Sequence, residues 1–368
     1  MIEYKVVLKS QSGVKFDELG EFEFLRYEKK RNDIGLLQLK LNGDYAKRAQ
    51  LILDTQIEVW RKDDSAGVAW YCDAEYFYKA PEKLSDDDGV KTLSAEGAGL
   101  LAMLDGVLVI PATGQEMTSV NAAADSAIYS LADSNVGAGA GSRQKSNFSI
   151  ASVGGTASSV TRDVRRSEYL LRTMQQLADA ARKAGTGVEF EVVGAGRDAT
   201  LAAGYFKLKF GVPYLGTDKR ATLVFAEERG NMRQPRLKID AAKATRVYVA
   251  GTGEAASQVI QQVVDTMAES ESPWNRKESW LDAGDQADTA ALTAAGNAYL
   301  RDNRKKTTFK FQPVETEATR YGRDWNLGDV VTGRFDGADY PVQITSVRVT
   351  VQPSGDDYEK IEVGMEDV

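Results

Sequence analysis

The side chains that could carry out chemistry in this 368-residue chain are carboxylates, lysines and a single thiol. Histidine is absent and Cys72 is the only cysteine. Ser-His-Asp and Cys-His catalysis is therefore excluded, as is a zinc, haem or non-haem iron site with histidine ligands. One cysteine also excludes a disulfide framework or a thiolate zinc cluster within one chain. Chemistry by carboxylates, lysine or backbone amides stays open, as does a protein with no chemistry.

Two groups of carboxylates are close enough in sequence to be candidate sites. Asp86-Asp87-Asp88-Gly89 lacks the ligand alternation of a calcium loop, because adjacent residues cannot all point at one ion, and a hairpin tip is favoured. Asp282 and Asp285 flank Gly284 after Trp280-Leu281, an arrangement that could indicate glycoside hydrolysis. They also precede an expected helix, where aspartate is favoured at the cap and in the first turn.

Three Gly-x-Gly patterns could indicate a nucleotide site: Gly137-Ala-Gly139-Ala-Gly141, Gly194-Ala-Gly196 and Gly251-Thr-Gly253. None has the full G-x-G-x-x-G spacing, and no P-loop occurs. Only Gly251-Thr-Gly253 follows a predicted strand and precedes a predicted helix, so turn geometry explains these glycines better than nucleotide binding. Cys72 lies in a predicted strand beside Trp70 and Tyr71, and we expect a small buried hydrophobe. We therefore assign no catalytic, cofactor-binding or metal-ligating residue, and no cofactor.

The charge of the chain argues against a partner held by its phosphates. There are 46 basic and 54 acidic side chains, a net charge of −8, and no basic stripe interleaved with aromatics. The first residues lack the basic and apolar regions of a signal peptide, and no stretch approaches the ~18 apolar residues of a membrane span. We expect a protein made in a cytoplasm, neither exported by a signal peptide nor inserted in a membrane. Its length suggests two or three domains.

The first hundred residues alternate polar and apolar side chains with a period of two, which is typical of an antiparallel barrel or sandwich. Turn residues separate the runs. Strands are expected at 21–24, 37–41, 56–61, 69–78 and 90–95.

The periodicity then changes to that of helices. Apolar residues spaced by three and four predict a helix from Thr118 to about Asn135, capped by Thr118 or Ser119. Residues 137–161 are rich in Gly, Ser and Ala, which predicts a mobile loop or linker. A second helix is expected over 167–183, with Gly185 as its stop. Strands return at 188–193, 205–210, 221–225, 236–240 and 246–250.

The last third repeats this order. The spacing predicts helices over 257–267 and 288–303, the second ending in a basic run that offsets the helix dipole. Strands are then expected at 307–312, 329–334, 341–352 and 358–364. A second β-barrel would close the chain.

Several motifs occur in the order in which a known protein family has them. In the C-terminal third these are Trp280-Leu281-Asp282-Ala283-Gly284-Asp285 before a helix ending at Tyr299-Leu300, then Tyr321-Gly322-Arg323-Asp324-Trp325-Asn326-Leu327-Gly328-Asp329-Val330-Val331, then Gln343-Ile344-Thr345-Ser346-Val347. This order resembles the hub (minor tail) proteins of tailed phages, with their "D…D" step, "Y-x-x-D-x-x-L-G-D-x-V" turn and "R-I-x-x-V" strand. Gln343 stands where that family often has arginine. Leu327-Gly328-Asp329 is a tight turn that launches a strand.

The N-terminal end agrees. Residues 22–28, 32–41 and 57–61 look like the first barrel of such hubs, and residues 167–250 fit the domain inserted between two barrels. The resemblance implies an α+β, mainly β chain with two β-barrel-like domains and helical and α+β insertions. The expected division is a first barrel at 1–110, a helix and Gly/Ser-rich loop at 111–165, an α+β inserted domain at 166–255, a helical connection at 256–306, and a second barrel at 307–368.

The implied function is that of a structural protein of the virion, not an enzyme. It would be a homotrimeric baseplate or tail-tip hub that docks on the tail tube and the distal tail ring, with a tape measure protein and a tail fibre as further partners. Genomic DNA would pass through the lumen without specific binding, and assembly would occur in the host cytoplasm. The alternative is a receptor- or carbohydrate-binding tail-tip component, motivated by Trp70, Tyr71, Tyr76, Phe77 and Tyr78.

We expect the purified protein to leave peptidoglycan uncut, because the sequence offers no credible set of catalytic groups. A zymogram of the wild type beside Asp282→Asn and Asp285→Asn checks this. Cleavage by the wild type that either substitution abolishes would contradict it.

Overall fold

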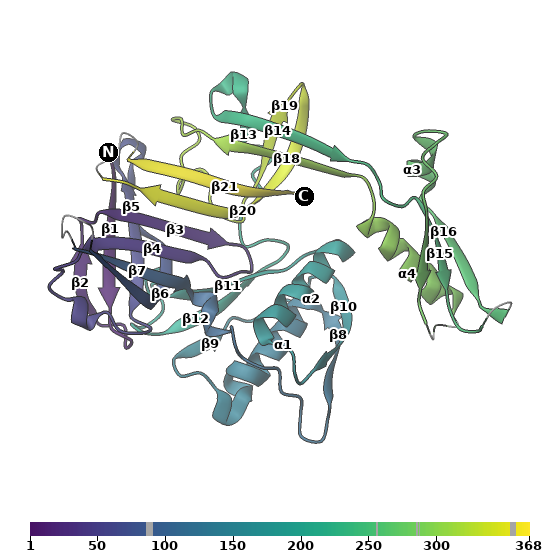
Figure 1. Cartoon of the computed structure of the whole chain (residues 1–368), viewed down its shortest axis with the longest axis horizontal. Coiled ribbons are helices and arrows are strands. Elements are labelled where there is room, and N and C mark those ends of the chain that lie inside the picture. Colours follow the sequence, from purple (N-terminus) through teal and green to yellow (C-terminus); the bar gives the residue numbers. More distant parts are fainter. Residues whose placement is uncertain (86–90, 255–256, 285, 287, 354–357) are drawn as a thin grey trace. The chain divides into compact units, whose positions relative to one another are not determined.

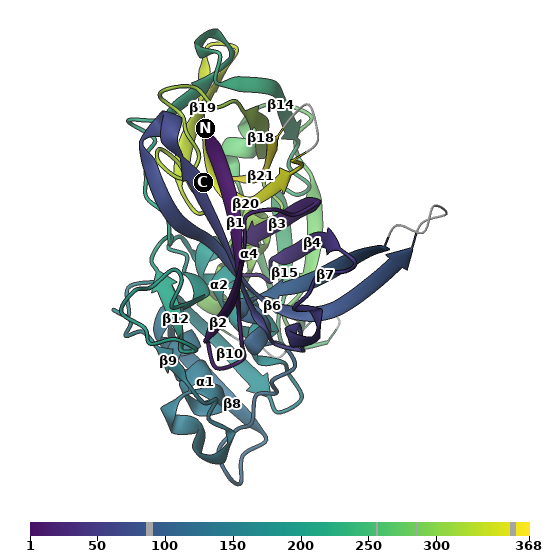
Figure 2. The ribbon, with the colours of Figure 1, turned by 90° about the vertical axis from the view of Figure 1, so that its left-hand side faces the viewer.

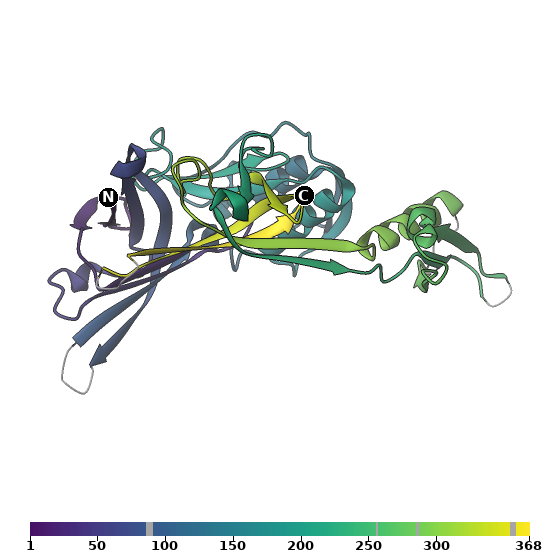
Figure 3. The ribbon, with the colours of Figure 1, turned by 90° about the horizontal axis from the view of Figure 1, so that it is seen from above.

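The chain folds into two units (Figure 1). Unit 1 is Met1–Pro235 with Phe311–Val368, and unit 2 is Arg236–Lys310. The strands β14 (Met232–Asp240) and β18 (Lys306–Pro313) pair as a two-stranded ribbon that contains both boundaries (Figure 3). Unit 2 is therefore an insertion in a unit built from both ends of the chain. The parts of the chain that the computed structural model describes are residues 1–85, 91–254, 257–284, 286, 288–353 and 358–368.

Unit 1 is built around one eleven-stranded sheet. Its main path has the order β13-β19-β20-β3-β4-β7-β6-β5-β1-β2, and β21 pairs with β20. Neighbouring strands are antiparallel except β13 and β19, which are parallel. The strands are β1 (Ile2–Lys9), β2 (Lys15–Leu19), β3 (Phe24–Lys30), β4 (Leu36–Asn42), β5 (Gln56–Asp63), β6 (Val68–Ser85), β7 (Lys91–Gly99), β13 (Val224–Ala226), β19 (Val330–Phe335), β20 (Ala338–Val351) and β21 (Glu359–Asp367).

The long strand β20 joins the two ends of the chain. Its first half pairs with β19, its second half pairs with β3, and β21 lies along its other edge. Val347 and Val349 are thus opposite Lys29 and Tyr27. The prediction of a mainly β chain is confirmed, but the described strands close no barrel: those of the two ends continue one another in a single sheet. A period of two shows which residues form strands, and does not show which strands pair.

Most of the N-terminal strands were predicted. The strands expected at 37–41, 56–61 and 69–78 lie within β4, β5 and β6, and the described part of 90–95 lies in β7. Of 21–24 only Phe24 is in a strand, and β1 and β2 were not predicted at all. Strands β6 and β7 extend as a long hairpin away from the rest of the sheet (Figure 2). Asp86-Asp87-Asp88-Gly89 lies outside the described residues.

An α/β part packs its own core within unit 1. Helices α1 (Ala124–Val136) and α2 (Leu170–Ala184) pack on each other, on the pair β8 (Met117–Ala123) with β10 (Ser159–Arg165), and on the sheet β11-β12-β9, whose strands are Glu189–Gly194, Phe206–Gly211 and Phe148–Ile150. The helix predicted over 167–183 is confirmed as α2. Gly185 ends it with φ 125°, which favours glycine.

The helix predicted from Thr118 begins six residues late. Residues 117–123 form β8, in which Val120 is opposite Arg162 of β10, and α1 begins at Ala124 without a side-chain cap. The predicted caps Thr118 and Ser119 are strand residues. Thr, Ser, Val and Asn are weak helix formers, and a distant partner strand decides their conformation. The predicted end near Asn135 is confirmed.

The segment 137–161 is not a structureless linker. It contains a 3₁₀ turn at Ala138–Arg143, strand β9, and the start of β10. Residues 155–157 lie between β9 and β10. The backbone N–H groups of Gly155, Thr156 and Ala157 donate to the fully buried carboxylate of Asp125 in α1, at 2.7, 3.1 and 3.3 Å. Backbone pairing and one buried carboxylate hold a segment that has few apolar side chains.

Unit 2 is a three-stranded sheet with one long helix. Strand β15 (Arg246–Ala250) pairs antiparallel with β16 (Ile260–Val264) and parallel with β17 (Glu278–Asp282). The helix predicted over 257–267 is wrong, since this stretch forms β16 and the start of the short α3 (Thr266–Ser270). Its Val and Ile residues favour a strand once β15 is available as a partner. The helix predicted over 288–303 is confirmed as α4 (Thr289–Asp302), capped by Asp288.

The remaining predicted strands agree within a few residues. Those at 188–193, 205–210, 236–240 and 246–250 correspond to β11, β12, β14 and β15, whereas only the end of 221–225 is in β13. The last four correspond to β18, β19, β20 and β21. Further 3₁₀ turns lie at Arg48–Gln50, Asp64–Ala66, Leu100–Met103 and Glu227–Arg229.

We expect Asp125→Ala to expose residues 151–158 to subtilisin, because three backbone N–H groups lose their acceptor. The free energy of unfolding should fall by about 1–3 kcal/mol. Asp133→Ala is the control, since the carboxylate of Asp133 accepts an exposed hydrogen bond at 3.3 Å from the N–H of Gly139. First cuts that stay outside 151–158 in Asp125→Ala would show that this carboxylate does not hold the segment.

Candidate functional site

The motif at 321–331 ties the C-terminal strands to those near the N-terminus. The hydroxyl of the fully buried Tyr321 donates to the carboxylate of Asp73, whose oxygens are 2.8 and 3.0 Å away. Its backbone carbonyl accepts from Arg61 Nη1 at 3.1 Å. Its ring has Lys29 Nζ at 5.1 Å and the Arg61 guanidinium carbon at 5.4 Å from its centroid. One tyrosine therefore contacts strands β3, β5 and β6.

Asp73 is the acceptor at the centre of this cluster. Besides Tyr321, it accepts from the hydroxyl of Tyr27 and from Lys29 Nζ, each at 2.5 Å. Burial acts to raise the pKa of Asp73, but the charge of Lys29 and the three donors outweigh burial, so its pKa lies below the ordinary value. The carboxylate is therefore ionised inside the protein and is neutralised by one lysine.

Arg61 is the second buried charge. Its side chain is fully buried and binds the Glu359 carboxylate of β21 through Nε at 2.8 Å and Nη2 at 3.1 Å. Nε also donates to the hydroxyl of Tyr4 at 3.0 Å, and Glu315 lies 3.6 Å from Nη2. This two-bond contact with a carboxylate suits the fork geometry of arginine. Arg61 thus joins β1 and β5 to β21 and to the segment before the motif.

Two glycines let the motif approach its neighbours. Gly322 has φ 81°, and a Cβ there would lie 2.1 Å from the hydroxyl oxygen of Tyr71. Gly328 has φ 89°, and the carboxylate of Asp329 accepts from the N–H groups of Asn326 and Thr217 at 2.9 and 2.8 Å. The prediction of a tight Leu327-Gly328-Asp329 turn before a strand is confirmed, since β19 begins at Val330.

Gln343 occupies the position where the resembled family often has arginine. Its Oε1 accepts from Arg31 Nη1 at 2.7 Å, and its Nε2 donates to Glu189 Oε1 at 2.6 Å and to the carbonyl of Gly328 at 3.1 Å. Arg31 supplies the guanidinium from the end of β3. Burial raises the pKa of Glu189, whose other oxygen accepts from the N–H of Leu215.

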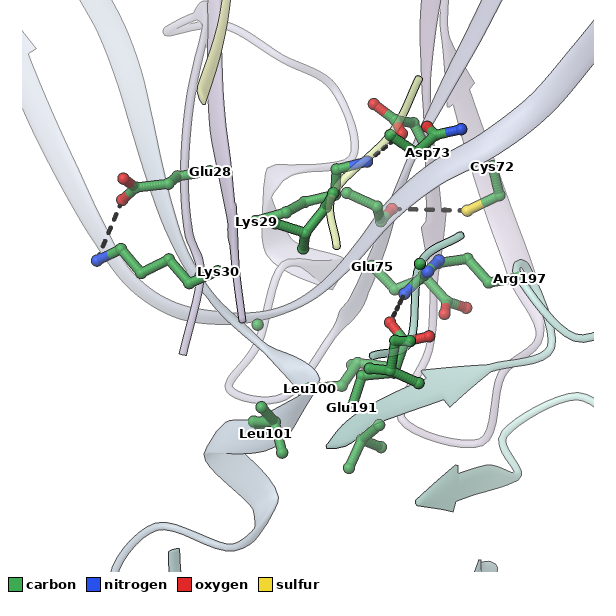
Figure 4. A pocket seen from close by; sticks show the side chains of 18 of the residues that line it. Glu28, Lys29, Lys30, Cys72, Asp73, Glu75, Leu100, Leu101, Glu191 and Arg197 are labelled. Carbon is green, nitrogen blue, oxygen red and sulfur yellow. Dashed lines mark hydrogen bonds and ion pairs between the residues drawn. The ribbon is translucent and has the colours of Figure 1, made fainter. Parts of the chain in front are cut away.

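A pocket of about 440 Å³ lies where these segments meet (Figure 4). Its walls come from β3, β6, β11 and the loops around 215–219 and 322–329. Three ion pairs lie along its walls: Lys29 with Asp73, Arg197 with Glu191 at 2.6 Å, and Lys30 with Glu28 at 3.3 Å (Figure 4). These charges neutralise one another, and the pocket lies between segments that are distant in the chain.

The Gly194-Ala-Gly196 pattern binds a carboxylate of its own chain. The N–H groups of Gly194 and Gly196 donate to Glu75 at 2.7 and 3.0 Å. Burial raises the pKa of Glu75 although these two donors oppose it. Cys72 is buried, as predicted, and burial raises the pKa of its thiol. A Cβ on Gly196 would lie 2.9 Å from that sulfur.

The other candidates belong to other elements of the chain. Gly251-Thr-Gly253 lies between β15 and β16, in a strand-to-strand turn instead of the predicted strand-to-helix turn. Gly137 ends α1, and the glycines after it lie in the 3₁₀ turn. Asp282 ends β17, where its Oδ1 accepts from the N–H of Gly284. Asp285 lies outside the described residues.

Of the five aromatics that motivated a carbohydrate-binding alternative, three are buried and two, Trp70 and Tyr71, are half-buried. Tyr76, Phe77 and Tyr78 are all buried, and the rings of Trp70 and Trp60 are both approached by Lys5. Within the described residues no group of three or more metal-ligating side chains occurs, and no helix there is long and apolar enough to cross a membrane.

Comparison with known proteins places the chain in a family. A sequence profile described as Siphovirus ReqiPepy6 Gp37-like protein matches residues 17–364. The chain belongs to this family. No curated protein sequence matches it.

Solved structures share the fold of this family member. A tail protein from Neisseria meningitidis MC58 is similar with a TM-score of 0.58 and 13% identity, covering 99% of this chain and 97% of that one. The 43 kDa tail protein of prophage MuSo2 from Shewanella oneidensis is similar with a TM-score of 0.58 and 10% identity, covering 100% and 98%. The Francisella PdpA-VgrG complex in its half-lidded form gives a TM-score of 0.52 at 11% identity, covering 100% and 57%.

The sequence pointed to the motif at 321–331 but not to the residues that this motif contacts. Lys29, Arg61 and Asp73 lie in strands that were predicted, yet their roles were not. Asp73-Ala74-Glu75 places two carboxylates inside a strand rich in aromatics, where charge is otherwise depleted. That local contrast was the available signal of a buried charge.

We expect Asp73→Asn to lower the free energy of unfolding by about 3–5 kcal/mol, because Lys29 keeps its charge in a buried site without its carboxylate. Urea denaturation at neutral pH measures the loss. Asp54→Asn is the matched control: its pair with Lys79, at 2.7 Å, is exposed, and such pairs contribute about 0–1 kcal/mol. Equal losses in the two variants would contradict a special role for Asp73.

The difference in free energy of unfolding between wild type and Asp73→Asn should also depend on pH. Because the pKa of Asp73 is lowered by folding, its contribution is fully present above the unfolded value of about 4 and is lost as the pH falls through the folded value. The difference between wild type and Asp73→Asn should therefore shrink between about pH 5 and pH 3. A difference that stays constant over this range would show that the carboxylate does not titrate there.

Proposed function

We propose that this protein is a structural component of a phage tail, and that it forms the trimeric baseplate or tail-tip hub at the end of the tail tube. The observation that carries the proposal is the extent of the fold likeness. Both tail proteins are covered almost completely, and so is this chain. The match is of a whole molecule, which a shared small domain would not produce.

The internal architecture suits a structural role. Both ends of the chain share one sheet, and buried charges fasten the 321–331 motif to it. Most of the charges that line the pocket between these parts are paired with each other. We infer that the protein acts through its shape and surfaces and has no turnover activity.

The finer features of the hub are part of the proposal. The strands β1–β7 and the strands β19–β21 would play the parts of two similar barrels, so that three copies offer six roughly equivalent faces to a six-fold tube. The free sheet edges at β2 and β13 would be paired or covered across subunits, since exposed edges are an aggregation hazard. The five-part division at 1–110, 111–165, 166–255, 256–306 and 307–368 stays a prediction.

The partners follow from this position. We propose contacts with tail tube or distal tail proteins, with the tape measure protein and with a tail fibre. DNA would pass through the lumen without specific binding, in keeping with the acidic balance of the chain. The protein would be a virion component assembled in the host cytoplasm.

We expect assembled tails to contain three copies of this chain in one ring. Quantitative mass measurement of purified tails and class averages of the tail tip check the number and the symmetry. Six copies in one ring would contradict the proposal. A monomer in dilute solution is compatible with it, because the ring can close on the tube.

A further inference from the structure

The sheet of unit 2 has one covered face and one open face. Helix α4 packs on the face that carries Val249 and Val263, and a Cβ on Gly296 would lie 3.0 and 2.5 Å from their methyl groups. Alternation along β15 therefore turns Tyr248 toward the opposite face. Helix α4 lies along only one side of β15 and β16 in Figure 1. The open face is defined here as Arg246, Tyr248, Ala250, Ile260, Gln262, Val264, Glu278, Trp280 and Asp282.

The middle of the open face is aromatic. Trp280 and Gln262 are the direct cross-strand neighbours of Tyr248, and cross-strand neighbours project to the same side. Trp280 is 56% exposed, which is unusual for the largest apolar side chain. In the next row Ala250 is buried, and Ile260 and Asp282 on either side of it are exposed.

Polar groups with spare hydrogen-bonding capacity surround the aromatic rings. Among the described residues, the side-chain amide of Gln262 has no hydrogen-bond partner. Asp282 uses Oδ1 to accept from the N–H of Gly284, which leaves Oδ2 for a ligand. An indole and a phenol ring thus lie next to a free amide and a free carboxylate oxygen.

Apart from Asp282, the charged side chains of the face are already paired. Arg246 binds Glu269 at 2.9 Å, and Arg276 at the rim binds Glu278, which also accepts from the hydroxyl of Tyr248 at 3.2 Å. Neither arginine is available for a phosphate or a carboxylate of a ligand. An anionic partner is therefore disfavoured.

The area of the face is too small for a stable protein partner. Three strands about 4.8 Å apart and five residues long cover roughly 14 by 16 Å, or about 230 Å². A stable protein interface needs about 800 Å² on each side. A ligand that is flat, narrow, uncharged and rich in hydroxyl groups fits this area.

We propose that the open face of unit 2 binds a neutral, flat glycan chain. The C–H face of one pyranose ring stacks on Trp280, the next ring lies over Tyr248, and hydroxyl groups bond to Gln262 and Asp282. Such stacking favours β-1,4-linked chains, which are extended ribbons. The inference concerns unit 2 alone and does not rest on the tail-hub proposal.

Titration of the full chain with chitohexaose and with cellohexaose, followed by calorimetry, tests the proposal. We expect saturable binding of at least one of them, weakened about tenfold by Trp280→Ala. Trp274→Ala is the matched control, because Trp274 is 90% exposed but lies outside the open face, and its affinity should stay within about twofold. Gln262→Ala, which removes no aromatic ring, should also weaken binding.

Three results would overturn the proposal. The first is no saturable binding of either oligosaccharide. The second is equal loss of affinity in Trp280→Ala and Trp274→Ala, which would indicate non-specific stacking. The third is equal or tighter binding of an anionic oligogalacturonate. Self-association that Trp280→Ala removes, without glycan binding, would make the face a protein contact and would likewise overturn it.

Discussion

Arg61 and Asp73 are charges buried in the central sheet, and each is neutralised by groups that are distant in sequence. Glu359 binds Arg61, and Tyr321 contacts both charges. Burying an ion is unfavourable unless it is paired and hydrogen-bonded. Removal of the C-terminal strands would leave Arg61 without its carboxylate, so the N-terminal strands depend on the last fifty residues of the chain.

This dependence explains why long insertions are tolerated between the two ends. The α/β part has its own core, and unit 2 has another. In the sequence, the α/β part and unit 2 both lie between strands of the eleven-stranded sheet. The pairing of β20 with β3 therefore closes a loop of the chain that contains both of these parts. The entropy of loop closure grows only slowly with length, which makes such insertions affordable once the closing contact is strong.

Several carboxylates in this protein hold its own backbone. Asp125 binds the N–H groups of 155–157, Glu75 those of Gly194 and Gly196, and Asp329 those of Asn326 and Thr217. In each case backbone N–H groups in a loop or at the end of a strand find their acceptor in a carboxylate that is buried or half-buried. The same arrangement accounts for the Gly194-Ala-Gly196 pattern, because a glycine lets the backbone approach a carboxylate as closely as it would a phosphate.

Features that depend on residues close together in the chain could be predicted from the sequence. Alternation specified β4, β5 and β6, and a three-four spacing with Gly185 specified α2. The Leu327-Gly328-Asp329 turn could be predicted because the positive φ of Gly328 and the bond between Asn326 and Asp329 are local. The strands at 117–123 and 260–264 could not be predicted from local sequence, because their pairing partners β10 and β15 lie elsewhere in the chain. The same is true of the single sheet that both chain ends form and of the ion pair between Lys29 and Asp73. Strand register and burial depend on contacts between residues that are far apart in the chain.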